Sequence, residues 1–217
     1  MTIDATYARW VHRHLLVLRF ALFNIVAVGL LAAVYLQGWL DGAMSGYTAW
    51  LTFGISAVFV FGLLLCAQRI WRTNNELNAA GQTEPPDKSR VGHYLTKVAG
   101  RSAESRAINA NLLRNRLGNQ ITIVRQTADS LVFLGLVGTV IGFIVALSGV
   151  DPQASAQLDE VATMVATLVA GMSIALYTTL VGAVLHVWLM VNHRFLATGT
   201  SNLFNAIVEL GEQRVGV

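Results

Sequence analysis

The sequence predicts an all-α integral membrane protein with four transmembrane helices, and three observations support this fold class. Of the 217 residues, 54% are hydrophobic and only 12% are charged. Four apolar runs are long enough to cross a hydrocarbon core about 30 Å thick at about 1.5 Å per residue. Lysine and arginine are absent from the segments that would join the two helices of each pair. The length suits one domain of about four spans with modest loops.

The predicted organisation divides the chain into five parts, and we expect the last two transmembrane helices to extend into the cytoplasm. The parts are a cytoplasmic or interfacial N-terminal arm at 1–19; a transmembrane hairpin at 20–71, with spans at about 20–39 and 50–70; a cytoplasmic loop and helix at 72–128; a second transmembrane hairpin at 129–191, with spans at about 129–150 and 161–191; and a cytoplasmic tail at 192–217.

The N-terminal arm is basic and mildly amphipathic, which is typical of a segment that lies along a membrane surface. A secretory signal peptide is the alternative interpretation. The apolar run Phe20–Leu36 is longer than the core of a usual signal peptide, and no clean small-residue cleavage site follows it. We therefore expect this run to be a permanent first span.

The distribution of basic residues predicts the orientation in the membrane. Every lysine and arginine falls in the N-terminal arm, in 69–125 or in the C-terminal tail, whereas 40–49 and 151–160 contain none. The positive-inside rule then places both termini and the central loop in the cytoplasm. Because this rule accounts for the basic composition, and because no nucleic-acid-binding motif is present, we expect no nucleic-acid partner.

The central loop opens with the turn-rich stretch Gly81–Asp87, which must interrupt any helix that continues from the second span. From about Arg90 the pattern becomes helical. A stripe of apolar residues at spacings of three and four then passes without a break into the third span; it consists of Leu113, Leu117, Ile121, Val124, Ala128 and Leu131. This stripe predicts that the third span continues as a helix into the cytoplasm. Because the fourth span is also longer than a bilayer needs, we expect the two extensions to pack together as a helical cytoplasmic stalk.

Small residues lie at helical spacing in both spans of the second hairpin. Gly138 and Gly142 form the small-xxx-small pattern that allows close helix contact in lipid. Ordinary packing is the default interpretation for any one of these glycines. The residues that we assign to helix packing or to a subunit interface are Gly135, Gly138, Gly142, Gly171 and Gly182.

Hydroxyl side chains follow the same two helices. In the fourth span they form two adjacent stripes, with Thr163, Thr167 and Thr178 on one and Thr179 on the other. Thr139 lies beside the glycines of the third span. A threonine in a membrane helix most often bonds the carbonyl four residues before it, so packing is again the default for each one. Together, the five threonines are candidates for the lining of an ion path.

The residues exclude most catalytic chemistry. The predicted spans contain no intramembrane carboxylate, no paired histidines and no glycine-rich phosphate loop, so we expect neither an enzyme nor a metal site. The single cysteine, Cys66, has no partner for a disulfide. His186 and Asp129 lie toward the predicted cytoplasmic ends of their helices. We regard them as a possible cytoplasmic mouth, with helix N-capping as the default role of Asp129.

Two strings in the second hairpin resemble the MotA/TolQ/ExbB proton-channel family of ion-driven motor subunits. They are Leu134-Gly-Leu-Val-Gly-Thr-Val-Ile-Gly142 and Ala170-Gly-Met-Ser-Ile-Ala-Leu-Tyr-Thr-Thr-Leu-Val-Gly182. By position, Thr139 and Thr179 resemble the pore-facing threonines of the family. Some members carry a glutamate where this chain has Ile174, and a proline often precedes the first string, where this chain has Asp129-Ser130-Leu131.

The resemblance implies a ring, typically a pentamer, around two copies of a single-span partner similar to ExbD, TolR or MotB. The partner would supply an intramembrane aspartate, which this chain lacks, and the moving ion would be H⁺ or Na⁺ rather than a bound cofactor. The resemblance also implies a multi-pass protein of the bacterial inner membrane. The short loop favours a motor other than the flagellar one.

Two other classes of function stay open at the level of sequence. A passive membrane scaffold would use the glycines and threonines for packing alone. A small solute transporter would show inverted repeats and broken helices at the bilayer midplane, and the sequence has no convincing internal repeat and few prolines.

Overall fold

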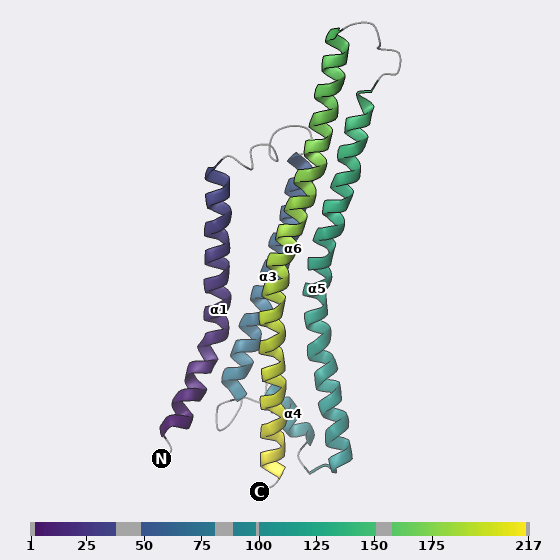
Figure 1. Ribbon diagram of the computed structural model, residues 1–217. Helices are drawn as coiled ribbons and strands as arrows, with labels where there is room; N and C mark the ends of the chain where they lie inside the picture. The colour runs from purple at the N-terminus through teal and green to yellow at the C-terminus, as the bar shows by residue number, and fades with distance from the viewer. Residues whose placement is uncertain (1–2, 38–48, 81–88, 99, 151–157, 216–217) are drawn as a thin grey trace. The chain divides into compact units, whose positions relative to one another are not determined.

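The computed structural model describes residues 3–37, 49–80, 89–98, 100–150 and 158–215, and the elements in these ranges are all helices. In chain order they are α1 (Ile3–Leu36), α3 (Ala49–Ala80), α4 (Arg90–Val98), α5 (Ala103–Ser148) and α6 (Leu158–Val215) (Figure 1). All but the short α4 are long and apolar enough to cross a membrane. The structure thus confirms an all-α chain with four helices of transmembrane character.

The helices of the second hairpin extend well beyond the thickness of a bilayer. Helix α5 has 46 residues and α6 has 58, which correspond to about 69 Å and about 87 Å along the two helices. A hydrocarbon core needs only about 30 Å. Both helices are therefore longer than a single crossing requires, and α6 includes nearly all of the predicted tail.

Two helix boundaries differ from the sequence-based expectations. The helical region that begins at Arg90 consists of two helices, because Gly100 adopts a left-handed conformation with φ of 71° between α4 and α5. Asp129 lies inside α5 and is flanked by helix on both sides, so the expected N-capping role is wrong. The turn-rich stretch 81–87 and most of the acidic joint 151–160 lie outside the described residues.

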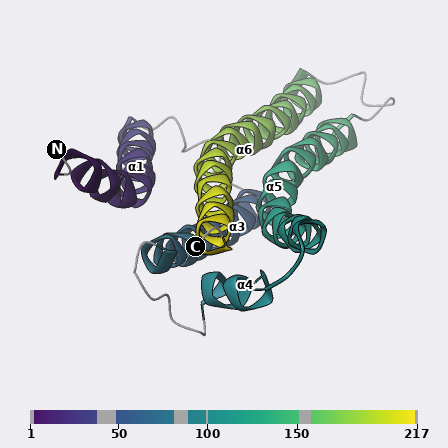
Figure 2. The same ribbon diagram turned by 90° about the horizontal axis from the view of Figure 1, so that it is seen from below.

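The chain divides into two compact units, and the helices pass from one into the other. The first unit comprises residues 1–25, 63–125 and 191–217, of which 3–25, 63–80, 89–98, 100–125 and 191–215 are described. Its core forms where α4 packs against α5 and α6 (Figure 2). The buried residues of this core are Val91, Tyr94, Val98, Leu117, Leu203 and Ile207. Thus α4 buries its apolar face against both long helices.

In the same unit, α1 contacts α6 through an aromatic pair and an amide pair. The rings of Phe23 and Phe195 meet edge to face with their centroids 5.8 Å apart. The amide nitrogen of Asn24 donates to the amide oxygen of Asn192 at 2.8 Å, and the reciprocal bond measures 3.3 Å. Asn192 is fully buried. Because a buried amide is costly without partners, this pair specifies how α1 lies against α6.

The second unit comprises residues 26–62 and 126–190, of which 26–37, 49–62, 126–150 and 158–190 are described. Helices α5 and α6 run antiparallel and side by side in it, as both views show (Figures 1 and 2). Helix α3 joins them through Phe59, whose ring centroid is 5.0 Å from that of Trp188. This unit contains the glycines and threonines singled out in the sequence.

The amide pair yields a test by double-mutant cycle. We expect Asn24→Leu or Asn192→Leu alone to lower the stability by about 1 kcal/mol, because each leaves a buried amide without this partner. The double variant should lose less than the sum of the two, since neither amide then remains. Thermal unfolding of the purified protein in detergent measures the stability of the two single variants and of the double variant. Strictly additive losses of stability would contradict the hydrogen bond between Asn24 and Asn192.

Candidate ion-path site

Glycines bring α5 and α6 into backbone contact. A Cβ atom built on Gly142 would lie 2.6 Å from the backbone nitrogen of Ala175, and one built on Gly138 would lie 2.5 Å from the Cβ of Thr178. A Cβ on Gly171 would overlap the backbone of Ala146. Backbone atoms cannot move aside as a flexible side chain can, so Gly142 and Gly171 are required for steric reasons. Gly138 leaves room for the side chain of Thr178.

The same contact continues toward Gly135 and Gly182. A Cβ on Gly182 would lie 2.8 Å from the carbonyl oxygen of Leu131, and one on Gly135 would lie 3.2 Å from the carbonyl oxygen of Thr178. The five glycines chosen from the sequence therefore lie in a helix contact within one chain. Because this contact buries them, we do not place the contact between subunits on these faces.

The close approach brings the hydroxyl groups of Thr139 and Thr179 into hydrogen-bond contact across the two helices. The Oγ1 of Thr139 lies 3.2 Å from the carbonyl oxygen of Gly135 and 3.5 Å from that of Ala175. The Oγ1 of Thr179 lies 3.1 Å from the Ala175 oxygen and 3.4 Å from the Gly135 oxygen. Thr179 is exposed and Thr139 is half-buried. Two hydroxyls and two carbonyls thus form a group of four oxygens at an accessible edge of the helix pair.

The four oxygens of this group share only two hydroxyl protons. This ratio determines which hydrogen bonds the group can donate and which it can accept. Each hydroxyl can donate to the other threonine or to a carbonyl, so the direction of the hydrogen bonds can reverse without movement of the backbone. The unused lone pairs can accept from water or from a protonated carboxyl group, or coordinate a small cation. Neither hydroxyl can release its proton at neutral pH. The group can therefore guide an ion but needs an external acid to exchange protons.

The three other candidate threonines occupy different surroundings. Thr178 is 2% exposed, and its hydroxyl donates to the carbonyls of Ile174 and Ala175 at 3.0 and 3.1 Å. It therefore belongs to the helix contact beneath Gly138 rather than to an open surface. The hydroxyl of Thr167 donates to the carbonyl of Thr163 at 3.0 Å, while Thr167 packs against Gly149. Thr163 is exposed.

His186 contacts the backbone of α5 at Ala128, the residue before Asp129. The Nδ1 atom of His186 is 2.8 Å from the carbonyl oxygen of Ala128. A carbonyl oxygen only accepts hydrogen bonds, so Nδ1 carries the proton and Nε2 has the free lone pair of the neutral ring. Asp129, next to Ala128 in α5, is half-buried. The contact thus fixes the orientation of the His186 ring against α5.

Sequence reasoning missed Ala175. Ala175 is 3% exposed, opposes Gly142 and provides a carbonyl to both hydroxyls of the threonine pair. Ala146 opposes Gly171. The signal that could have identified it is the small-xxx-small spacing of Gly171 and Ala175, which places the alanine on the contact face.

These features define a helical membrane protein of four spans, in which a glycine contact supports a pair of hydroxyls. A family model described as the MotA/TolQ/ExbB proton channel family matches residues 91–209, more than half of the chain. The chain therefore belongs to this family, which consists of channel and motor subunits and not of enzymes. Comparison with curated proteins and with solved structures finds no match.

The glycine contact gives a steric test. We expect Gly142→Ala to lower the stability by about 1–3 kcal/mol, because the added methyl group meets the backbone of Ala175 and Gly171. Gly54→Ala is the matched control on α3 of the same unit, since no atom lies within 4 Å of its Cβ position. The control should leave the melting temperature in detergent unchanged or slightly higher. Equal effects of the two substitutions would contradict the contact.

Proposed function

We propose that the chain is the ring-forming subunit of an ion-driven membrane motor. It lines an ion path around a dimer of a single-span partner and converts the flow of protons or sodium ions into mechanical work. The observation that supports this proposal most directly is the accessible hydroxyl pair of Thr139 and Thr179. It occurs in a member of a proton-channel family. The hydroxyls form the polar wall that an ion would pass.

The lack of an acid on these helices supports the need for a partner. Residues 131–150 and 161–191 contain no aspartate or glutamate. A proton path through a membrane needs a titratable group, and a hydroxyl does not fill that role at neutral pH. We infer that an intramembrane aspartate of the partner exchanges the proton and meets Thr139 and Thr179 as the ring moves past it.

The arrangement of small and large residues supports assembly through other faces. The glycines are used between α5 and α6, whereas large apolar side chains on the remaining faces are exposed. Such exposed side chains on α3 and α5 include Phe53, Phe61, Leu64, Phe133 and Leu136. These surfaces suit contact with neighbouring copies and with lipid. We propose a pentamer in a bacterial inner membrane, with both termini on the cytoplasmic side.

His186 and Asp129 form the proposed cytoplasmic mouth of the path. The contact of His186 with Ala128 leaves Nε2 as the site for an arriving proton. Asp129 follows Ala128 in α5 and adds a carboxyl group at this level of the helix pair. A proton released by the partner's aspartate would then meet these side chains before it reaches the cytoplasm.

The threonine pair is tested by removing its hydroxyls without changing its shape. We expect Thr139→Val with Thr179→Val to lower proton flux at least about tenfold in liposomes that contain the chain and its partner, because the passing ion loses its oxygen contacts. Thr139→Ser with Thr179→Ser keeps both hydroxyls and should retain most of the flux. Ser173→Ala, which removes another hydroxyl of α6, should have little effect. Unchanged flux in the double valine variant would favour the passive scaffold.

The substitution His186→Asn tests the proposed cytoplasmic mouth of the ion path. The asparagine amide can donate to the Ala128 carbonyl in place of Nδ1, but it cannot titrate. We expect a melting temperature close to that of the wild type and a proton flux reduced several-fold in the same liposomes. If both stability and flux equal those of the wild type, His186 serves only packing.

A further inference from the structure

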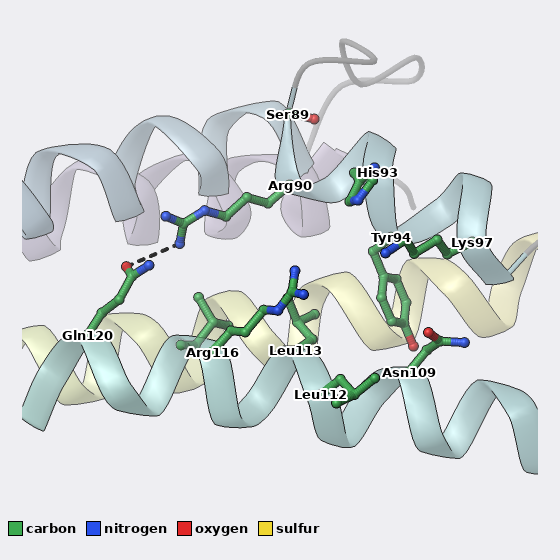
Figure 3. A pocket seen from close by; sticks show the side chains of 11 residues that line it. Ser89, Arg90, His93, Tyr94, Lys97, Asn109, Leu112, Leu113, Arg116 and Gln120 are labelled. Atoms are coloured by element: carbon green, nitrogen blue, oxygen red, sulfur yellow. Dashed lines mark hydrogen bonds between the residues drawn. The ribbon is translucent and has the colours of Figure 1, made fainter.

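A basic groove lies between α4 and α5 within the first unit. It encloses about 410 Å³, which is within the size range of small-molecule sites, about 300–1,000 Å³. Figure 3 shows the side chains of His93 and Lys97 from α4 and of Arg116 from α5 on its walls. Leu112, Leu113 and Leu117 provide an apolar surface. The groove therefore combines a cationic rim with an apolar floor.

Positive charge in the groove is not balanced by its other lining residues. Three residues with fixed positive charge line it, Arg90, Lys97 and Arg116, and none of the lining residues is acidic. Arg90 is held by Glu76, with Nε 3.7 Å from the carboxylate, and by Gln120 at 3.3 Å (Figure 3). Among the described residues, Lys97 and Arg116 have no ion-pair partner. Two cationic side chains are thus free to bind an anion.

The neighbouring polar groups suit a phosphate group. Arginine and lysine side chains can each donate several hydrogen bonds to phosphate oxygens. Arg116 lines the groove from α5, and Lys97 lines it from α4. His93 and Asn109 also line the groove and add side-chain donors. The leucines and the ring of Tyr94 can cover an apolar or aromatic part of the same ligand. This combination matches an organic phosphate better than a simple inorganic ion.

The position of the groove along α5 separates it from the membrane lipids. Thirteen residues lead from Arg116 to Asp129, where the third span was predicted to begin, and they measure about 20 Å along the helix. The headgroup layer adds only about 5–8 Å to each side of the hydrocarbon core. A lipid phosphate in the bilayer would therefore lie too far away, and a soluble phosphate is the better fit.

We propose that this groove binds a soluble phosphate-bearing anion, an organic phosphate or polyphosphate, through Arg116 and Lys97. A bound ligand would tie α4 to α5 in the part of the chain outside the membrane. The proposal is independent of the ion path, because no residue of the groove belongs to the glycine contact or to the threonine pair.

Calorimetry with inorganic pyrophosphate tests the groove in the full-length protein in nanodiscs of phosphatidylcholine. We expect one binding event per chain at constant ionic strength, and at least about tenfold weaker binding in Arg116→Gln and in Lys97→Gln. Arg114→Gln is the matched control, because it removes the same charge from the same helix two residues away and does not line the groove. It should bind as the wild type does.

Three results would overturn the proposal. The first is the absence of binding, and the second is equal weakening by Arg114→Gln and Arg116→Gln, which would indicate diffuse attraction of anions. The third is a response to nanodiscs of phosphatidylglycerol without a response to pyrophosphate, which would assign the basic residues to lipid.

Discussion

The close contact between α5 and α6 is the interaction on which the rest of the candidate site depends. Apolar burial gives little drive for helix association in lipid, so the association relies on dispersion contacts between backbones that glycine allows to meet. Gly142 of α5 faces Ala175 of α6, and Gly171 of α6 faces Ala146 of α5, so the two backbones come together at these positions. A methyl group at either glycine would separate the helices. The hydroxyls of Thr139 and Thr179 would then no longer reach each other.

This contact also determines the chemistry that the chain can perform alone. It holds two hydroxyls and two carbonyls in one small group, which offers lone pairs to a passing ion but holds no titratable proton. The chain belongs to a proton-channel family, so a site that binds an ion without exchanging a proton can still form part of an ion path. We infer that the working site is shared with a partner that carries the acid, so the chain provides the fixed wall and the partner provides the proton carrier.

Much of this arrangement could be predicted from the sequence, because lipid imposes strong patterns. Long apolar runs predicted the helices, and the spacing of four between Gly138 and Gly142 predicted a close helix contact. Thr139 and Thr179 were chosen from their positions in the two family-like strings. The break at Gly100 could not be predicted, since local pattern does not reveal how α4 packs on α5 and α6. The apolar stripe from Leu113 to Leu131 did predict an unbroken helix at Asp129, and only the N-capping role expected there was wrong. The groove at Arg116 could not be predicted for the same reason, because it forms only where α4 lies against α5.

Native mass spectrometry of the detergent-purified chain, alone and co-expressed with a single-span partner, tests the central claim of a shared ring most directly. The account predicts a pentamer that gains two copies of a partner with an aspartate in its apolar segment. A stable monomer or dimer that binds no such partner would contradict it. The glycines and threonines would then serve helix packing alone.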